Sequence, residues 1–253
     1  MKTMIEMAVL GLLLATPRAE ARSLEEIRKA GTIVVATEGA FPPFNFFRGP
    51  TLTGFEVEVA EALAKRMGVA IEWRALSFDA LLVGLRQDRW DMVIASFAIT
   101  PAREKAVTFT DPHYCSGGVV VSKDPGIRTA RDLAGKVVAV QTGTTYLENV
   151  RRLAGVGEVK NFPKDTDARS ALASGRVDAW VTDRFVAKAA VEADPAAGLR
   201  LGDFVFVERI APAVRKGNTA LAAAINEALG AIMSDGTYEA ISRKFLNEDV
   251  RCR

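Results

Sequence analysis

Short apolar runs alternate along this chain with longer segments in which apolar residues recur every three or four positions. The short runs are typical of buried strands and cover residues 32–37, 70–75, 91–95, 136–140, 158–162 and 178–182. The segments with helical spacing cover 54–67, 78–85, 129–133, 144–153, 165–174, 183–193, 218–234 and 237–246. Because strands that alternate with helices form parallel sheets with helices on both faces, we predict an α/β fold.

Local sequence signals mark several element ends. Ser23 and Glu26 form a capping-box pattern that opens a short helix, which we expect to end at Gly31. Thr100 followed by Pro101 is typical of another helix start. Residues 38–50, rich in Phe, Pro and Gly, are predicted to be a loop.

Two extended stretches, 107–122 and 201–215, interrupt the alternation and suggest that the chain crosses twice between two α/β lobes. We expect lobe 1 to hold residues 22–113 and 210–253, lobe 2 to hold residues 118–205, and hinge crossovers at 114–118 and 206–211. The Gly117-Gly118 pair would give the first crossover backbone freedom. Ligands of open α/β sheets bind beyond the carboxyl ends of the strands, where two such lobes would face each other across a cleft.

The N-terminus has the pattern of a secretory signal. Lys2 precedes a short apolar run at residues 8–15, and Ala19-Glu20-Ala21 is a small-x-small triplet. We predict a signal peptide over residues 1–21 and a periplasmic location; the alternative is an amphipathic N-terminal helix. In that oxidising compartment Cys115 and Cys252 are expected to form one disulfide, the alternative being two buried free thiols.

Composition limits the classes of function. The 253 residues are 49% hydrophobic and 25% charged with a net charge of +2, and the charges are interspersed, so we expect no nucleic-acid partner. One histidine and two cysteines exclude the common zinc and iron–sulfur ligand sets, and we expect no metal and no cofactor. Gly143-Thr144-Thr145 is not followed by the Lys of a phosphate loop, and no serine has a matched histidine base.

Polar and aromatic side chains follow five of the predicted strands. Together they supply one cation, two carboxylates, several hydroxyls and phenyl rings; they are Glu38, Phe41, Phe78, Ser96, Arg103, Gln141, Thr144, Thr145 and Asp183. A zwitterionic amino acid needs such a set: a guanidinium and a helix N-terminus for its carboxylate, an acid for its ammonium, and aromatic walls for its side chain.

The order of these segments resembles the family 3 solute-binding proteins, the periplasmic components that deliver polar amino acids to ABC transporters. The similarity spans residues 30–248 and rests on "TEGAFPPFNF", "LTGFEVEVAEALAKRMG", "DMVIASFAITPAREKAVTFTDPHY", "VVAVQTGTTY" and "VDAWVTD". The resemblance implies a type II periplasmic-binding-protein architecture. It also implies a monomer that closes on its ligand by hinge motion and docks onto an inner-membrane permease.

The same resemblance implies roles for the ends of the ligand. Arg103 would clamp the carboxylate, assisted from the other lobe by Thr145 and the helix that Thr144 opens. Asp183 and the backbone carbonyl of Ser96 would hold the ammonium. Two structural alternatives stay open: Arg103 could pair with a surface acid, and Asp183 could only cap its helix.

Four further positions concern the ligand's side chain, and a fifth departs from the family. Phe41 and Phe78 would flank the side chain, while Glu38 and Gln141 would read its far end. Relatives often carry Ser or Thr where this chain has Ala98, whose backbone N–H can still donate to the carboxylate.

The predicted function is therefore amino-acid capture, not catalysis. An acidic Glu38 between aromatic walls favours a basic or amide-bearing amino acid. One alternative on the same fold is a periplasmic cyclohexadienyl dehydratase, for which Glu38 or Asp183 would be the general acid. Another is a sensory or accessory binding protein with the same site.

Overall fold

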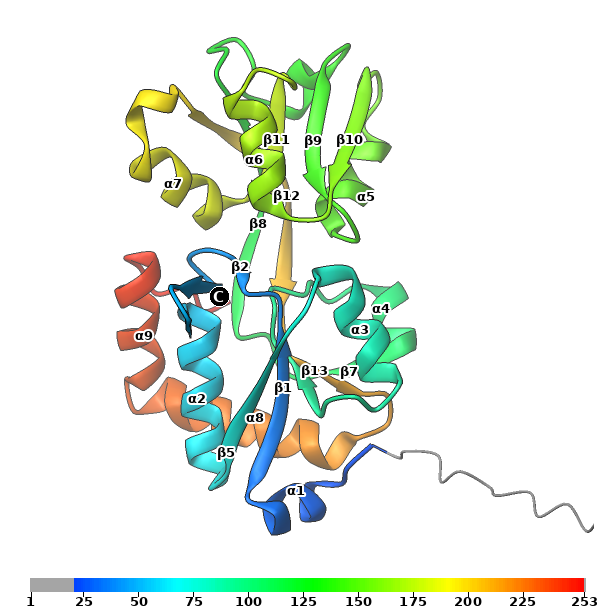
Figure 1. The fold of residues 1–253 in the computed structure, drawn as a ribbon, viewed down its shortest axis with the longest axis vertical. Coiled ribbons are helices and arrows are strands. Elements are labelled where there is room, and N and C mark those ends of the chain that lie inside the picture. Colours follow the sequence, from blue (N-terminus) through cyan, green and yellow to red (C-terminus); the bar gives the residue numbers. More distant parts are fainter. Residues whose placement is uncertain (1–20, 253) are drawn as a thin grey trace, which may run out of the picture.

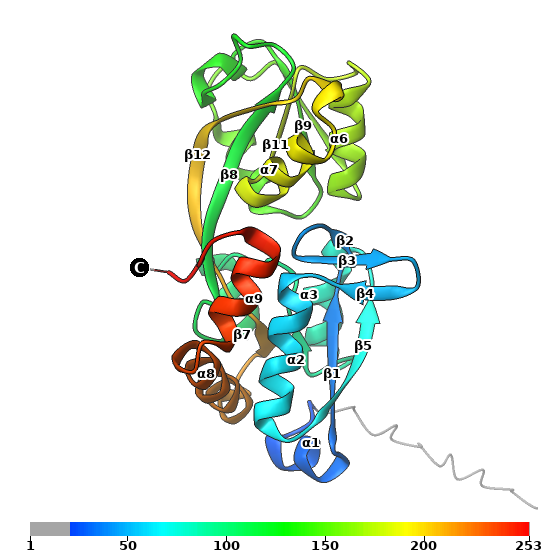
Figure 2. The same cartoon turned by 90° about the vertical axis from the view of Figure 1, so that its left-hand side faces the viewer.

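The computed structural model describes residues 21–252, so the predicted signal peptide lies outside the described residues except for its last residue. The chain forms two halves connected by a pair of long strands (Figures 1 and 2). We call the half that holds the first sheet lobe 1 and the other half lobe 2. None of the helices within residues 21–252 is long and apolar enough to cross a membrane.

Lobe 1 is built on a five-stranded sheet, in which β1 is parallel to both of its neighbours. In spatial order the strands are β5 (Ala70–Ala75), β1 (Thr32–Thr37), β6 (Met92–Val93), β13 (Ala213–Arg215) and β7 (Val107–Phe109). The helices of this lobe are α1 (Leu24–Ala30), α2 (Phe55–Met67), α3 (Phe78–Arg86), α4 (Pro101–Ala106), α8 (Thr219–Ser234) and α9 (Thr237–Leu246). The C-terminal helices pack beside α2, so the chain returns to the lobe in which it began (Figure 1).

Lobe 2 repeats the arrangement with a second five-stranded sheet. Its strands in spatial order are β10 (Glu158–Phe162), β9 (Val137–Gln141), β11 (Ala179–Asp183), β8 (Tyr114–Ser122) and β12 (Arg200–Ile210). Its helices are η1 (Ala130–Leu133), α5 (Thr145–Arg152), α6 (Asp165–Ala173), α7 (Arg184–Ala193) and η2 (Pro195–Ala197). The α/β class is confirmed, but the sheets are mixed: β13 runs antiparallel in lobe 1, and β8 is antiparallel to β11 and β12.

The predicted loop at residues 38–50 is wrong. It contains β2 (Ala40–Phe41) and β3 (Asn45–Arg48), which form a small antiparallel sheet with β4 (Thr51–Thr53). The Phe and Pro residues that hid the strand signal have a packing role, because Phe41 and Phe44 are buried. This small sheet lies at the top of lobe 1, against the gap between the lobes (Figure 2).

The helix ends follow the predicted local signals. Ser23 and Glu26 form the capping box of α1, and Gly31 ends that helix in the left-handed conformation. Thr100 caps α4, because its hydroxyl accepts a hydrogen bond from the Arg103 backbone N–H at 3.2 Å. This cap fixes the start of the helix that carries the predicted carboxylate clamp.

The strands β8 and β12 pair along their length and carry the chain between the lobes (Figure 1). The glycines at 117 and 118 also have a packing role. A Cβ on Gly117 would lie 2.1 Å from the Phe206 carbonyl oxygen, and one on Gly118 would lie 2.5 Å from the Phe206 ring. Glycine is needed here for close approach of the two strands.

The predicted disulfide is confirmed. Cys115 near the start of β8 is bonded to Cys252, 137 positions later, with 4.9 Å between the two Cα atoms. The Cys115 backbone N–H also donates to the Val250 carbonyl at 3.1 Å. The C-terminal segment is thereby attached to the strand that leaves lobe 1.

Candidate functional site

Eight of the predicted site residues line one narrow cavity between the lobes. Lobe 1 contributes Glu38, Phe41, Phe78, Ser96 and Arg103, and lobe 2 contributes Gln141, Thr144 and Thr145. Ala95 and Tyr146, which the sequence did not single out, complete the lining. Except for Phe41 on β2, the predicted residues come from the ends of β1, β6 and β9 and from the helices that follow β5, β6 and β9, as expected for a ligand site of open α/β sheets.

Arg103 lies across the gap between the lobes. Its guanidinium donates to the Ala98 carbonyl at 3.0 Å within lobe 1 and to the Gly143 carbonyl at 3.1 Å in lobe 2. The guanidinium carbon is 4.9 Å from the centre of the Phe97 ring and 5.9 Å from that of Phe78, within the range of cation–π attraction. Burial lowers the pKa of Arg103, yet a guanidinium remains charged, so the cavity has a fixed cation at this end.

Helix α5 presents its N-terminus to the same cavity. Thr144 is the cap, with its hydroxyl accepting from the Leu147 N–H at 3.2 Å and donating to the Gln141 carbonyl at 2.7 Å. Thr145 is the first residue of the helix, where backbone N–H groups have no partner within the helix. Its hydroxyl donates to Glu208 on β12 at 2.7 Å. The positive end of the helix is therefore directed to the part of the cavity that holds Arg103.

Glu38 is the acidic residue of the cavity lining. The Gln141 side chain donates to a Glu38 oxygen at 2.7 Å and links the two lobes. Burial raises the pKa of Glu38 to about 8, the neighbouring carboxyls of Asp165 and Asp79 add to this rise, and Gln141 opposes it. A buried acid with such a pKa is costly to ionise unless a cation approaches it.

Asp183 lies behind the cavity and is fully buried at the end of β11. One carboxylate oxygen caps α7 by accepting from the Phe185 N–H at 2.7 Å, and the other has no hydrogen-bond partner among the described residues. Burial raises the pKa of Asp183 to about 7, Ser116 opposes the rise, and Glu208 adds to it. Asp183 is thus a helix cap with one oxygen left over.

Ser96 is held by a buried polar network centred on Glu56. Its backbone adopts a positive φ of 55°, and its N–H and hydroxyl donate to the two Glu56 oxygens at 2.7 and 3.0 Å. Asn45 and His113 approach the same carboxylate at 2.8 and 3.1 Å. Glu56 therefore fixes the segment after β6 on which Ser96 lies.

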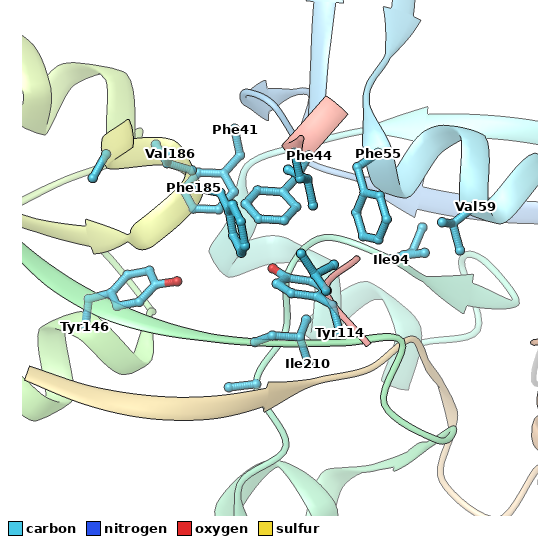
Figure 3. Close-up of a cluster of buried hydrophobic side chains, with 14 of the residues drawn as sticks. Phe41, Phe44, Phe55, Val59, Ile94, Tyr114, Tyr146, Phe185, Val186 and Ile210 are labelled. Atoms are coloured by element: carbon cyan, nitrogen blue, oxygen red, sulfur yellow. The ribbon is translucent and has the colours of Figure 1, made fainter. Parts of the chain in front are cut away.

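Aromatic rings from both lobes pack next to the cavity (Figure 3). Phe44 lies between Phe185 and Phe55, with ring centres 6.1 Å from each, and stacks on Tyr114 at 4.9 Å. Phe41 stacks on Phe44 at 5.7 Å, which makes it part of the core as well as of the cavity lining. These contacts bring the two lobes together around the small sheet.

Ala98 lies in a second hollow, which we call the hinge groove, with an empty volume of about 1330 Å³. Thr145 lines both the cavity and the groove, while Glu208 lines only the groove. Glu208 was missed at the level of the sequence. The sequence feature that could have indicated it is an acid directly after four apolar residues of a strand, in the segment "FVFVE".

Comparison with known proteins places this geometry in a family. The family described as bacterial extracellular solute-binding proteins, family 3, matches residues 33–248. The L-cystine-binding protein TcyJ of Escherichia coli (strain K12) is 36% identical over 232 residues, which are 90% of this chain and 87% of the relative. The putative ABC transporter arginine-binding protein 2 of the same organism is 34% identical over 227 residues, 87% of this chain and 92% of the relative.

Two solved structures extend the comparison. An ancestral arginine-binding protein bound to arginine has a TM-score of 0.81 and 41% identity, covering 85% of this chain and 98% of that one. The ancestral amino acid-binding protein AncCDT-1, a precursor of cyclohexadienyl dehydratase, has a TM-score of 0.81 and 33% identity, covering 88% and 99%.

Proposed function

Because this chain belongs to family 3 of the bacterial extracellular solute-binding proteins, we propose that it binds a basic amino acid between its lobes. The resemblance predicted from the sequence phrases is confirmed, and the related proteins serve amino-acid ABC transporters. We further propose that a signal peptide directs the chain to the periplasm and that it acts there as a monomer. It would deliver its ligand to an inner-membrane permease.

The observation that carries the basic specificity is the buried carboxyl of Glu38 in the lining of the cavity. Burial raises its pKa more than the neighbouring Lys164 lowers it, so Glu38 still lacks a compensating positive charge. A guanidinium or ammonium at the tip of the ligand's side chain would supply that charge and form a charge-assisted hydrogen bond. An acidic side chain would instead place two carboxylates together in a buried site.

The rest of the cavity suits the common part of an α-amino acid. Its carboxylate would lie at Arg103 and the N-terminus of α5, where a planar guanidinium and helix N–H groups point to the same space. Its ammonium would lie at the Ser96 carbonyl and the free oxygen of Asp183. The side chain would then pass between Phe41 and Phe78 to reach Glu38.

Capture would depend on contacts that only the closed arrangement provides. Arg103 bonds to Gly143 and Gln141 bonds to Glu38, and each pair joins the two lobes. A ligand that contacts both lobes binds the closed form better than the open one, so it shifts the population by that difference in affinity. The bend would lie in the crossover residues 114–118 and 206–211, and the closed form would be the one that docks onto the permease.

A binding screen tests this function. Thermal unfolding of the mature protein is measured with each of the common amino acids, ornithine and cystine, since a tight ligand raises the midpoint by mass action. We expect arginine, lysine or ornithine to give the largest rise, followed by calorimetry on that ligand and on glutamine. Glu38→Gln should weaken the cationic ligand much more than glutamine. Equal weakening of both, or a largest rise with glutamate or with cystine, would contradict the basic specificity.

A second candidate function is cyclohexadienyl dehydration. It is favoured by one feature: the raised pKa values of Glu38 and Asp183, about 8 and about 7, would keep a proton available for a leaving hydroxyl. The dehydration converts a prephenate-type acid into an aromatic keto acid, carbon dioxide and water. Incubation with prephenate and an absorbance assay for the aromatic product decides the question, and turnover lost in Glu38→Gln would support the enzyme.

A further inference from the structure

Glu208 is a partly buried acid that the proposed binding mode leaves without a role. It lies on β12, opposite Ser116 of β8, in the part of the strand that leads back to lobe 1. Successive side chains of a strand point to opposite faces. Val207 is accordingly 76% exposed, whereas the Glu208 side chain is directed to the interior.

The contact between Glu208 and Thr145 determines what Thr145 can offer a ligand. The Thr145 hydroxyl donates to a Glu208 oxygen at 2.7 Å. A hydroxyl has a single proton to donate. While that proton is shared with Glu208, Thr145 has only its backbone N–H left for a carboxylate in the cavity.

Glu208 is also electrostatically part of the carboxylate end. The Arg103 guanidinium attracts it, and the Asp183 and Tyr114 side chains lie close enough to feel its charge. One of its oxygens is buried without a hydrogen-bond partner among the described residues. Glu208 therefore offers Arg103 and Thr145 a carboxylate from within the protein.

We propose that Glu208 is a specificity residue of the carboxylate end, which competes with the ligand's carboxylate for the Thr145 hydroxyl and for the charge of Arg103. The proposal rests on the proposed function, in which Arg103 and Thr145 receive that carboxylate. Glu208 lowers the affinity for guests that carry a carboxylate at this end, relative to cationic guests that lack one.

Protonation of Glu208 would reverse the hydrogen bond. A neutral Glu208 donates to the Thr145 oxygen and leaves the hydroxyl proton free for the ligand. Burial raises the pKa of Glu208, while Thr145, Tyr146 and Arg103 oppose the rise. The preference for a carboxylate-bearing guest is therefore greatest at low pH and decreases as the pH rises through this raised pKa.

The test compares arginine with agmatine, which has the same guanidinium and amine but no carboxylate. Dissociation constants are measured by calorimetry, with agmatine measured by displacement of arginine, at about pH 5 and about pH 8. Glu38 and Asp183 act on the cationic groups that both guests share, so their titration largely cancels in the ratio of the two constants. Glu208→Gln imitates the neutral acid.

We expect Glu208→Gln to raise the preference for arginine over agmatine by roughly tenfold at pH 8, the size of one charge-assisted hydrogen bond. The variant's preference should also change little between pH 5 and pH 8. The matched control is Asp203→Asn, which removes an exposed acid from the same strand and should leave the ratio unchanged. An unchanged ratio in Glu208→Gln would overturn the proposal and leave the proposed function intact.

A second measurement can be made without any ligand. A double-mutant cycle of Glu208→Gln and Thr145→Val on urea unfolding should show coupling between the two side chains at pH 8. If the wild type binds no basic amino acid, the proposed function fails and this cycle decides the role of Glu208. Coupling supports its hold on Thr145, and independent effects overturn it.

Discussion

At the scale of single residues, the site combines one fixed cation with acids that burial keeps partly neutral. Arg103 has its charge met by two backbone carbonyls and two aromatic faces. Burial raises the pKa values of Glu38 and Asp183 more than the nearby cations Lys164 and Arg184 lower them. The two positive groups of a cationic amino acid would compensate Glu38 and Asp183, and its carboxylate would bind to Arg103.

Replacing Arg103 with alanine should abolish detectable binding of the best ligand in calorimetry. The change removes the planar donor of the carboxylate and its bond to Gly143 in lobe 2. Loss of one partner of a buried, hydrogen-bonded charge pair commonly costs several kcal/mol, or roughly a hundredfold or more in affinity. Arg103→Lys, which keeps the charge without the fork, should retain part of the affinity. Wild-type affinity in Arg103→Ala would remove this residue from the site.

The stability of the protein should depend on the state of Glu38. A carboxyl whose pKa is about 8 in the folded protein and about 4.3 in the unfolded chain favours folding when protonated. That contribution is complete below the unfolded value and is lost as the pH rises through 8. Without a ligand, the temperature of the unfolding midpoint should decrease as the pH is raised from about 5 to about 8.5.

The Glu38→Gln variant isolates this effect. Its midpoint should fall several degrees less over that range, with the remaining slope due to Asp183, Asp165 and Glu208, whose pKa values are also raised by burial. Glu25→Gln, at an exposed position of α1, serves as the control and should keep the wild-type slope. A Glu38→Gln slope equal to that of the wild type would show that Glu38 is ionised in the free protein.

At the scale of elements, the sequence predicts what depends on local signals. Strands β1, β5 and β10 and helix α9 have the predicted bounds, because their apolar periodicity and flanking Gly or polar residues agree. The small sheet β2–β3–β4 was missed, since its strands are short and depend on pairing with each other. The residues of a strand do not show which strands it pairs with. For the same reason the antiparallel position of β8 was not predicted.

The same distinction applies to the site. Residues next to strand ends could be predicted because the topology places strand ends together. Glu208 and the Glu56 network could not, since their partners Thr145 and Ser96 lie 63 and 40 positions away in the chain. Ala98 could be chosen only by analogy with relatives, and its side chain lies outside the cavity.

The two strands between the lobes should tolerate no side chain at Gly117. An added Cβ would meet the backbone of β12 at 2.1 Å, so the strands would have to separate. Gly117→Ala should therefore lower the free energy of unfolding by 1 kcal/mol or more, on the scale of overpacking. Gly230, in the middle of α8 with no atom near its Cβ position, is the matched control. Gly230→Ala should raise the free energy of unfolding by about 0.4–1 kcal/mol. If urea unfolding shows that Gly117→Ala also raises it, the close approach of the two strands is contradicted.

At the scale of the whole molecule, the arrangement explains why one ligand would couple the two lobes. The lobes have separate sheets and are joined by β8 and β12 (Figures 1 and 2). The cavity lining is divided between them, with Arg103 and Glu38 on one side and Gln141 and Thr145 on the other. Neither lobe alone presents the whole lining, so closure of the lobes contributes to the binding free energy.

Binding should therefore make the molecule more compact, and small-angle X-ray scattering can measure this. In the wild-type protein, saturation with the best basic amino acid should reduce the radius of gyration, because closure is favoured only when both sets of contacts form. Arg103→Ala should show no reduction at the same ligand concentration. Asp203→Asn, whose exposed acid is outside the cavity, should behave like the wild type. If calorimetry shows the wild type to be saturated while its scattering is unchanged, the lobes are closed before the ligand binds. Thr145 and Gly143 would then already be in place beside Arg103, and affinity would depend on the cavity contacts alone, without a contribution from movement of the lobes.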